Sequence, residues 1–538
     1  MLKAASPLIW APLMLPTSRN EESLNQELAV WPARLTPEPT WADGAHAALL
    51  GRSTPSRGYD QADVYGSSSG ASTEADVKFL HEIRDPVYGF VTVNSHERRV
   101  VDSAPVQRLR HVSQLAMSSL VYPGATHKRF EHSLGVMHLA GEAFDVLTRQ
   151  ENVSDAVRDV VPELNEPDNL PYWKSVIRMA ALCHDLGHLP FSHAAEQILP
   201  PGVTHETLSE ELILSPDMEE IFASMIPPLT PKVVAKLAVG PSKSRENFGV
   251  WEAILTEIVT GDAFGVDRMD YLLRDSLHAG VAYGRFDYLR ILQTLRLLQM
   301  SALENDEASL APSVGVQQGG LNAAEALLLA RYFMFSQVYF HPVRIIYDIH
   351  LADFLKLWLP GEKFSGKLED HLRINDNDIW VAIRDTAHDV SHPAHNPAQR
   401  IYERKHFKLL YSRRPSDVEL FHKPGHAIAS WAKEEYGSDA VRYRASEKSG
   451  GALDFLVQEP LGTIASSTTV SDTLRNLPPN TADLVFIRPD LLESASLAIK
   501  KEDFVRDLLA QAAEEEARVE DDEAAAEPAI RATNEEDE

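Results

Sequence analysis

The spacing of apolar residues predicts a chain made mostly of helices. In residues 132–148 the apolar positions recur at helical spacing and mark one broad face, formed by Leu134, Val136, Met137, Ala140, Ala143, Phe144 and Leu147. Residues 323–340 show a second long pattern of this kind, and residues 176–183 are typical of a buried helix. Shorter apolar runs at 454–458 and 482–489 are typical of strands.

The character of the sequence changes three times along the chain. Residues 1–75 mix Pro, Ser, Gly and Thr with charge and show little periodicity, which predicts a disordered leader. Residues 76–350 carry the helical pattern and form the predicted core. Residues 351–505 combine helical stretches with short apolar runs, which predicts a smaller C-terminal α+β lobe. Residues 506–538 form an acidic, Ala-rich tail, either a frayed helix or coil.

Composition sets the outer bounds on class and compartment. With 538 residues and 44% hydrophobic content, the chain can bury a large core and form more than one structural unit. Its single cysteine, Cys183, excludes an intramolecular disulfide and fits a reducing compartment; we expect an apolar filler, with a reactive thiol as the alternative. Three prolines interrupt the apolar first 19 residues, which argues against a signal peptide, and no run of about 18 apolar residues predicts a membrane span. We therefore expect a cytoplasmic protein, or a nuclear one in a eukaryote.

The formal charge of −28 is spread over the body as well as the tail. Residues 514–538 contain twelve acidic residues against two arginines, so the rest of the chain is also acidic. This balance disfavours nucleic acid as the main partner, because nucleic-acid binding relies on a broad cationic surface. An anionic substrate would have to meet a local group of cations, and one occurs at Arg108, Arg110, His111, His127, Lys128 and Arg129. The alternative is that these cations only solvate helix surfaces.

A divalent metal site is the strongest chemical prediction. His184 and Asp185 are adjacent, and His132 and Asp267 add a second nitrogen and a second oxygen ligand. Such a set suits Mn, Fe, Mg, Ni or Zn with open positions for water and substrate, whereas structural zinc usually takes thiolates. The spacing from His184 to His188 also suggests a metalloprotease, but that motif needs Glu where Asp185 stands. We expect His184 and His188 to share one face of a packed helix.

The order of these motifs resembles the HD superfamily of metal-dependent phosphohydrolases. The resemblance rests on residues 106–141, the run HDLGHLPFSH (184–193), the THE at 204–206 and residues 267–280. These segments are similar to the deoxynucleoside triphosphate triphosphohydrolases, which include the dGTPases and the vertebrate SAM- and HD-domain enzyme. The resemblance covers roughly residues 78–350. It implies an HD-domain helical core and hydrolysis of a dNTP to deoxynucleoside and triphosphate.

The same resemblance implies a role for individual residues. His205 and Glu196 resemble the pair that positions or deprotonates the attacking water, with Glu replacing the Asp of the vertebrate enzyme. His188 and His193 resemble phosphate-facing histidines, either of which could act as general acid. The residues that resemble substrate contacts are Gln114, Leu115, Arg129, Arg268, Tyr271 and Asp275. Arg129 would grip phosphates, Asp275 would accept the 3′-hydroxyl hydrogen bond, and Arg268 stands where the vertebrate enzyme has Lys. Without the family, His188 and His193 would be ordinary buried histidines.

A regulatory nucleotide site is a further implication of the resemblance. Asp102, Gln107 and Arg110 resemble residues that bind guanine nucleotide, and residues 403–408 loosely resemble the segment that reaches a neighbouring site, with Arg404 and Lys408 as the matching cations. These residues imply a GTP or dNTP activator and a homo-oligomer, either dimer or tetramer.

Several departures weaken this regulatory implication. The strand predicted at 81–89 has His81 in place of a Lys, and residues 333–350 lack the family's basic stretch. These changes put tetramer contacts and strict deoxyribose selection in doubt. The alternative role for Asp102, Gln107 and Arg110 is to tie the first helix to the core.

Two other functions fit parts of the sequence. One is a different HD phosphohydrolase that acts on nucleoside monophosphates, cyclic nucleotides or guanosine alarmones. The other is a non-catalytic nucleotide sensor or oligomeric scaffold, for which an intact metal set is a poor fit.

Overall fold

The computed structural model describes residues 80–299, 311–448, 453–501 and 503–518. The predicted leader, residues 1–75, and the acidic tail beyond residue 518 lie outside the described residues. By their internal contacts, residues Ala75–Glu538 form one unit, so the predicted core and the predicted C-terminal lobe belong to the same unit.

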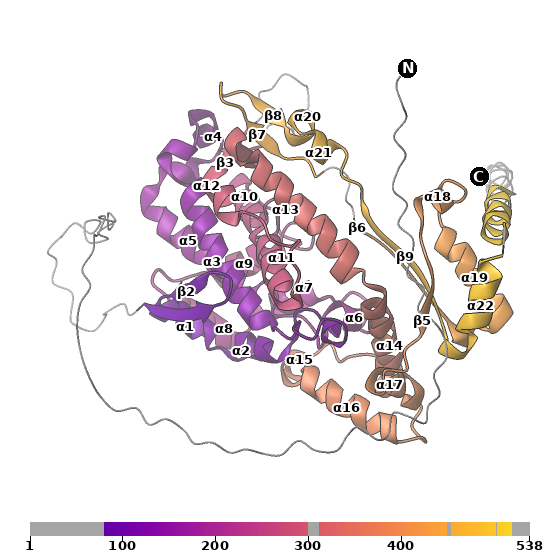
Figure 1. The fold of residues 1–538 in the computed structure, drawn as a ribbon. Coiled ribbons are helices and arrows are strands. Elements are labelled where there is room, and N and C mark those ends of the chain that lie inside the picture. The colour runs from indigo at the N-terminus through magenta and orange to yellow at the C-terminus, as the bar shows by residue number, and fades with distance from the viewer. Residues whose placement is uncertain (1–79, 300–310, 449–452, 502, 519–538) are drawn as a thin grey trace, which may run out of the picture. The chain divides into compact units, whose positions relative to one another are not determined.

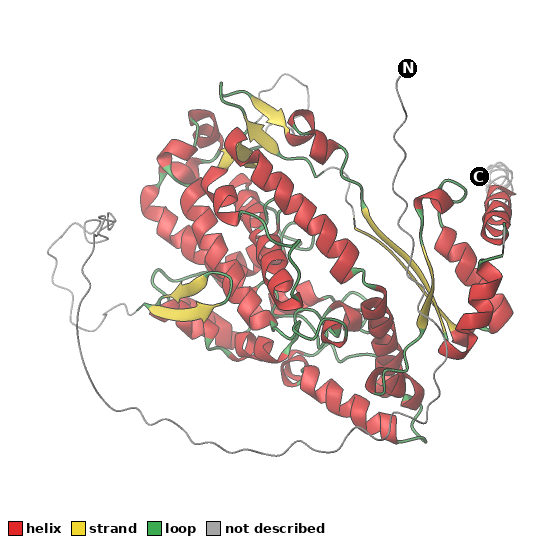
Figure 2. Ribbon diagram, viewed as in Figure 1, coloured by secondary structure: helices red, strands yellow, loops and turns green. Residues whose placement is uncertain are grey.

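Helices dominate the described residues, as the apolar spacing predicts (Figure 2). The first thirteen are α1 (Ser95–Val101), α2 (Ala104–Arg108), α3 (Arg129–Leu147), α4 (Asp155–Val160), α5 (Leu170–Cys183), α6 (His193–Glu196), α7 (His205–Ile213), α8 (Pro216–Ala223), α9 (Pro231–Val239), α10 (Val250–Thr260), α11 (Val266–Ala279), α12 (Tyr288–Thr294) and α13 (Leu321–Met334). The later ones are α14 (Pro342–Trp358), α15 (Leu368–Arg373), α16 (Asp376–His388), α17 (His395–Tyr402), α18 (Pro415–Val418), α19 (Pro424–Tyr436), α20 (Ser467–Val470), α21 (Asp472–Arg475) and α22 (Leu492–Ile499). No described helix is long and apolar enough to cross a bilayer.

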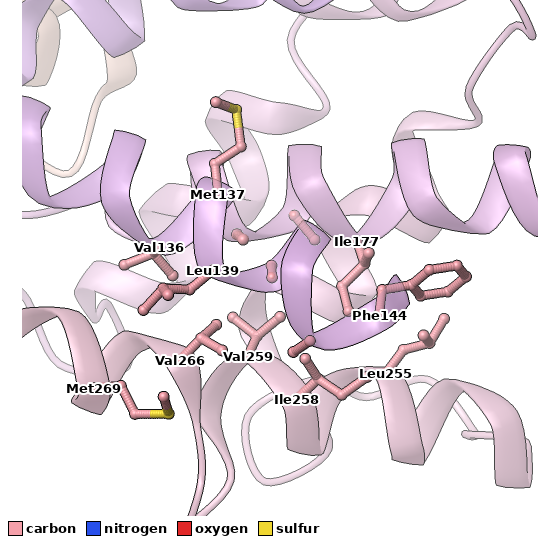
Figure 3. Close-up of a cluster of buried hydrophobic side chains, with 14 of the residues drawn as sticks. Val136, Met137, Leu139, Phe144, Ile177, Leu255, Ile258, Val259, Val266 and Met269 are labelled. Atoms are coloured by element: carbon pink, nitrogen blue, oxygen red, sulfur yellow. The ribbon is translucent and has the colours of Figure 1, made fainter. Parts of the chain in front are cut away.

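Helix α3 lies at the centre of the main apolar core and packs against α5, α10 and α11 (Figure 1). Figure 3 shows Val136 and Leu139 of α3 beside Val259 of α10 and Val266 of α11. All four of these side chains are at most 1% exposed. Burying each one contributes roughly 1.5–3 kcal/mol relative to leaving it in water. Because α3 is buried on most sides, the polar residues that it carries are also buried and need partners.

Gly135 allows α3 to approach α11 closely. A Cβ at this position would lie 1.9 Å from the Asp270 carboxylate and 2.4 Å from the Arg274 guanidinium. A side chain would therefore push α11 away from α3. This approach brings the polar face of α11 under His132, which lies one turn earlier on α3.

The strands form three small sheets. β1 (His81–Asp85) and β2 (Gly89–Val93) make an antiparallel hairpin. The prediction of one strand over residues 81–89 is therefore wrong: Asp85 accepts hydrogen bonds from the N–H groups of Val87 and Tyr88, and the chain turns there. The second sheet has the order β3 (Leu295–Leu298), β4 (Ser313–Gln317), β7 (Leu456–Gln458) and β8 (Ile464–Ser466). The third has the order β5 (Lys408–Ser412), β9 (Asn480–Ile487) and β6 (Val441–Lys448).

The strands predicted at 454–458 and 482–489 are confirmed by β7 and β9. The boundary predicted at residue 350 falls inside α14, which runs without a break from Pro342 to Trp358. Strand β7 also pairs in parallel with β4, so the C-terminal part of the chain shares a sheet with the helical core. A second apolar cluster joins Phe354 of α14 and Ile379 of α16 to Leu189 and Phe191. Through this cluster the later helices support the loop that follows α5.

Candidate metal centre and active site

The four predicted metal ligands come from two helices and from the loop that follows a third. His132 lies on α3, His184 and Asp185 directly follow α5, and Asp267 lies in the first turn of α11. Helix α5 ends at Cys183, so the prediction that His184 and His188 share one helix face is wrong. The chain turns because α7 packs against the loop at Gly187, where a Cβ would lie 2.0 Å from the His205 carbonyl oxygen. The free thiol of Cys183 is fully buried and burial raises its pKa, as expected for an apolar filler.

The possible ligand atoms of these residues lie close together: those of His132, His184 and Asp185 all lie within 4.8 Å of one another, and Asp267 Oδ1 lies within 3.4 Å of both imidazoles. His132 Nε2 lies 3.0 Å from Asp267 Oδ1 and 3.6 Å from Asp185 Oδ2. His184 Nε2 lies 3.4 Å from Asp267 Oδ1 and 3.3 Å from Asp185 Oδ1. The structure thus brings together residues that are separated by up to 135 positions in the sequence. The nearness of both carboxylates to both imidazoles is what a shared cation requires.

Each imidazole is held in place through its other nitrogen. His132 Nδ1 lies 2.7 Å from Asp270 Oδ2, and His184 Nδ1 lies 2.8 Å from the carbonyl oxygen of Ala181. The Asp270 carboxylate and the Ala181 carbonyl fix the tautomer in which Nδ1 carries the proton, and Nε2 is then available as a ligand. His184 Nε2 is buried and makes no hydrogen bond to another described residue. This arrangement fits a bound divalent ion.

The charged groups of the cluster shift one another's pKa values. Without a bound ion, burial lowers the pKa of His132, but hydrogen bonds to Asp267 and Asp270 outweigh it and raise that pKa to about 10. Burial raises the pKa of Asp185, yet Arg129, His184 and His188 together hold it well below its usual range. The side chain of Asp267 is 29% exposed, whereas His132 is 1% exposed. One side of the cluster is therefore open to solvent, which is typical of a catalytic rather than a structural metal site.

A second cluster lies beside the first and contains the predicted proton-transfer residues. His205, the first residue of α7, contacts the Glu196 carboxylate through Nδ1. The rings of His188 and His205 stack with centroids 4.1 Å apart. His188 Nε2 is 3.3 Å from Asp185 Oδ1, so Asp185 touches both clusters. Burial and the charge of Arg129 hold the pKa of His188 well below its usual value.

Helix α7 and the loop after α5 are tied together by one serine. Ser209 Oγ accepts a hydrogen bond from Gly187 N at 2.8 Å and donates to the His184 carbonyl at 3.0 Å. These bonds place His205 next to His188. The side chain of His193, the remaining predicted catalytic histidine, lies outside the described residues, although its backbone begins α6.

Arg129, the predicted phosphate contact, is buried between the first cluster and an unusual turn. Its Nη1 contacts Asp185 Oδ2, while Nε and Nη2 donate to Ser192 Oγ at 2.9 and 2.8 Å. Phe191 and Ser192 both have positive φ, 57° and 56°. Such a backbone costs of order 1–3 kcal/mol per residue and persists only where the surroundings enforce it, often at functional sites.

The other predicted substrate residues occupy two kinds of environment. The amide oxygen of Gln114 is buried and accepts no hydrogen bond within the described part of the chain, and Leu115 is 5% exposed. Tyr271 lies edge-to-face against Tyr339, whose hydroxyl donates to Asp275 Oδ2 at 2.8 Å.

Two of the predicted contacts are already engaged within the protein. Asp275 Oδ1 lies 2.7 Å from His127 Nε2, so both of its oxygens have a partner, although a carboxylate can accept more than two hydrogen bonds. Arg268 donates to the Gly261 carbonyl at 3.0 Å and lies 3.4 Å from Asp262. Its guanidinium is therefore held at the end of α10.

The sequence prediction missed a buried network beneath His132. Asp270 accepts from Arg274 Nε at 2.9 Å and Nη2 at 2.8 Å, and from the hydroxyl of Tyr88 at 2.8 Å. Arg274 Nη1 also donates to Asp85 of the hairpin at 2.9 Å. The three-residue step from Asp267 to Asp270 and the four-residue step to Arg274 are the helical spacings that could have revealed it. The network holds the imidazole of His132 from behind.

The predicted regulatory residues fall into two groups. Gln107 Oε1 accepts from Arg110 Nε at 2.8 Å, and Asp102 pairs with Arg98 at 2.7 Å. Arg404 donates to the carbonyl of Leu120 at 3.1 Å, and Lys408 Nζ lies 3.4 Å from His406. Within the described ranges, no hydrogen bond or ion pair joins one group to the other.

Comparison with known proteins supports the motif assignment. Residues 129–226 match the HD domain family, and residues 287–435 match the HD associated region. Human deoxynucleoside triphosphate triphosphohydrolase SAMHD1 is 34% identical over 249 residues, which cover 42% of this chain and 37% of that protein. An uncharacterised protein of Methanocaldococcus jannaschii is 32% identical over 266 residues, 49% of this chain and 47% of that protein. The crystal structure of a hypothetical protein from Aquifex aeolicus aligns with a TM-score of 0.62 and 34% identity, covering 78% of this chain and 100% of that chain.

These matches and the geometry agree on the class of protein. A helical core that directs two histidines and two aspartates to one point, with one side open, is the expected form of an HD domain. The chain belongs to the HD-domain family. It spans about half or less of the length of the curated relatives described above.

Proposed function

We propose that the protein is a metal-dependent dNTP triphosphohydrolase, which converts a dNTP and water to a deoxynucleoside and triphosphate. The observation that carries the proposal is the convergence of His132, His184, Asp185 and Asp267 beside the His205–Glu196 pair. The substrate class is supported by the identity with SAMHD1, which is named for this reaction.

The four ligand residues would hold a divalent ion, either Mn, Fe, Mg, Ni or Zn. When bound, this ion supplies Lewis-acid polarisation of a phosphoryl oxygen and lowers the pKa of water. The Nη1 of Arg129 donates one N–H to Asp185, and its Nε and Nη2 each donate one to Ser192. Both terminal nitrogens therefore keep one N–H for phosphate oxygens. The guanidinium can then neutralise charge that builds up on the phosphates in the transition state.

Proton transfer is assigned to the second cluster. His205, oriented by Glu196, accepts a proton from the attacking water as the water oxygen bonds to the α-phosphorus. The bond between the α-phosphorus and the 5′-oxygen breaks, and His188 or His193 gives that oxygen a proton. The low pKa of His188 disfavours its protonated form, which favours His193 as the donor. The products are a deoxynucleoside and intact triphosphate. Gln114, Leu115, Tyr271 and Asp275 would face the sugar, with Asp275 accepting from the 3′-hydroxyl.

The proposal is tested by incubating purified protein with each of the four dNTPs and with GTP, after chelation and after reloading with a single metal. We expect deoxynucleoside and triphosphate from at least one dNTP, only in the metal-loaded samples. Release of phosphate or pyrophosphate instead would contradict the proposal. Turnover of a nucleoside monophosphate, cyclic nucleotide or alarmone, with no turnover of any dNTP, would favour the other HD-type reaction.

One observation favours a different role for the second cluster, namely binding a second metal ion. His188, Glu196 and His205 also have the spacing of metal ligands, and Asp185 touches both clusters. A two-metal site would use the second cluster for coordination rather than proton transfer. Elemental analysis of the active protein decides between them: we expect one ion per chain, and two ions would assign His205 to a second metal.

Regulation by a nucleotide is the last part of the proposal. A cavity of about 310 Å³ at the β1–β2 hairpin is lined by Arg84, Arg110 and Lys128, which offer three cations to a nucleotide, and also by Asp85 and Glu131. The guanidinium of Arg110 lies 3.5 Å from the centre of the Phe130 ring. A GTP or dNTP that binds across a subunit boundary there, with Arg404 and Lys408 supplied by another copy, would stabilise a dimer or tetramer by mass action.

Sedimentation and dNTP hydrolysis with and without GTP test this part. We expect GTP to raise both mass and rate in the wild type and to raise neither in Arg110→Ala. Unchanged mass and rate in all four samples would contradict the regulatory site and leave the catalytic assignment intact.

A further inference from the structure

We propose that Asp376, the first residue of α16, is a positioning residue for the active site. It joins the two loops that hold Gln114 and Arg129, so that a helix of the HD associated region completes the catalytic site. The consequence for turnover rests on the function proposed above, whereas the consequence for the loops does not.

Asp376 accepts one backbone hydrogen bond from each loop. Its Oδ2 accepts from Ser113 N at 2.7 Å, directly before Gln114, and its Oδ1 accepts from Phe191 N at 2.9 Å. The side chain of Asp376 is 2% exposed. A buried carboxylate with each oxygen on a different segment fixes the distance between those segments.

Helix α16 holds Phe191 by its side chain as well. The ring of Trp380 lies edge-to-face against the ring of Phe191, with centroids 5.6 Å apart. Asp376 and Trp380 are four residues apart and therefore lie on the same face of α16. The charge of Asp376 is balanced by Lys128, whose Nζ lies 3.7 Å away and donates to Ser113 Oγ at 2.8 Å.

The bond to Phe191 N occurs where the loop is strained. Phe191 and Ser192 both have positive φ, a backbone conformation that residues other than glycine rarely adopt. This backbone directs Ser192 Oγ to Arg129, from which it accepts two hydrogen bonds, and to the Ser113 carbonyl at 3.3 Å. Asp376 thus stabilises the turn that orients Arg129, without contacting Arg129 itself.

Asp376→Asn is nearly isosteric and separates positioning from bulk packing. An amide has only one acceptor oxygen, and its nitrogen would face a backbone N–H, so at least one loop loses its bond. The matched control is Asp385→Asn on the same helix, because Asp385 is exposed and pairs only with the adjacent Arg384 among the described residues.

Hydrogen exchange by mass spectrometry tests the loop contact without any substrate. In Asp376→Asn we expect peptides that cover Ser113 and Phe191 to exchange about tenfold faster than in the wild type, the usual scale for one lost hydrogen bond. Peptides from α3 should be unchanged, and Asp385→Asn should match the wild type. Unchanged exchange at both loops would overturn the inference whatever the enzyme does.

Kinetics then test the consequence for the site. Asp376→Asn should lower kcat/KM for the preferred dNTP by roughly 10- to 100-fold with metal content unchanged. Ser192→Ala should do the same, and the double variant should lose little more than either single one, because both act through Arg129. Multiplicative losses would overturn the assigned route. If the wild type hydrolyses no dNTP while the exchange result holds, the proposed function fails and the positioning contact stands.

Discussion

The two histidine clusters of the site differ in how firmly their imidazoles are held. His132 and His184 are each fixed through Nδ1, by a buried carboxylate and by a helix carbonyl, with the side chains 1% and 8% exposed. His205 is 18% exposed and contacts Glu196, which is 26% exposed. In the first cluster, His132 and Asp267 lie on the long packed helices α3 and α11, and His184 and Asp185 directly follow α5. In the second cluster, Glu196 ends the short helix α6, His205 begins α7, and His188, whose side chain is 3% exposed, lies in the loop before α6. A metal ligand must not move, while a proton-transfer group must exchange protons with water, and the two environments match these demands.

The largest expected effect comes from removing a ligand of the first cluster. Asp267→Ala, or His184→Ala combined with Asp185→Ala, should abolish both metal binding and dNTP hydrolysis, because the ion that activates water is lost. Metal content and turnover are measured on the same samples, with circular dichroism to show that the variants are folded. Exposed Asp217→Ala should behave as wild type. Near-normal turnover in a ligand variant that retains no metal would show that the metal centre is elsewhere.

The second cluster should give a smaller loss with the metal retained. His205→Ala and Glu196→Ala should lower kcat by roughly 100-fold or more, the usual scale for a lost general acid or base. Glu206 lies 3.3 Å from the same imidazole nitrogen, and Glu206→Gln is the control expected to lose less. Loss of metal from His205→Ala would instead place that residue among the ligands and remove the distinction between the clusters.

Disrupting the network beneath His132 should have a smaller effect than either of these changes. Asp270→Asn removes one oxygen from the network under His132 and should reduce metal affinity by roughly 10- to 100-fold, as outer-shell changes usually do. Asp275→Asn provides a matched control: it is equally buried on α11 but contacts His127, which is not a ligand. Titration of metal into the metal-free variants measures the effect. Equal affinities for all three proteins would mean that the network is only structural.

The smallest expected effect concerns a carboxyl outside both clusters. Asp185 and Asp270 have low pKa values because cations surround them, whereas Glu257 is half-buried and accepts a hydrogen bond from the N–H of Val314 at 3.0 Å. Burial raises the pKa of Glu257 to about 7 despite that bond. The ionisation of Glu257 therefore does not destabilise the native state below about pH 4.5. The destabilisation increases between about pH 4.5 and pH 7 and is complete above pH 7.

Glu257→Gln should remove this cost. The variant should match the wild type at about pH 5 and be more stable at about pH 8, by about 1–3 kcal/mol after allowing for partial exposure. Urea unfolding at the two pH values measures the difference, and exposed Glu246→Gln is the control. A variant that is less stable than the wild type at both pH values would show that the carboxylate stabilises the fold.

The sequence indicated candidate site residues that the structure brings together, but not the contacts that position them. His132, His184, Asp185 and Asp267 were recognisable because few side chains bind metals and their order is distinctive. Asp270 was missed although it follows Asp267 at helical spacing, because a second carboxylate on a helix usually faces solvent. Asp376 could not have been found, since it lies 185 residues after Phe191 and its partners are backbone N–H groups, which leave no trace in the residue types.

The fold, too, was predicted from the sequence only in part. Helices α3, α5 and α13 and strands β7 and β9 follow from apolar spacing, which reports burial along one element. The end of α5 at Cys183 and the hairpin at 81–93 were not predicted, because the first depends on contact between Gly187 and α7 and the second on a turn capped by Asp85. Both features depend on contacts that residue spacing does not encode.

The central claim is that water attacks the α-phosphorus of a dNTP at the metal centre. The most direct measurement is a single turnover of the metal-loaded protein in ¹⁸O-labelled water, followed by mass spectrometry of both products. The account predicts one labelled oxygen in the triphosphate and none in the deoxynucleoside, because the bond to the 5′-oxygen breaks on its phosphorus side. Label in the deoxynucleoside, or in a released phosphate or pyrophosphate, would contradict it.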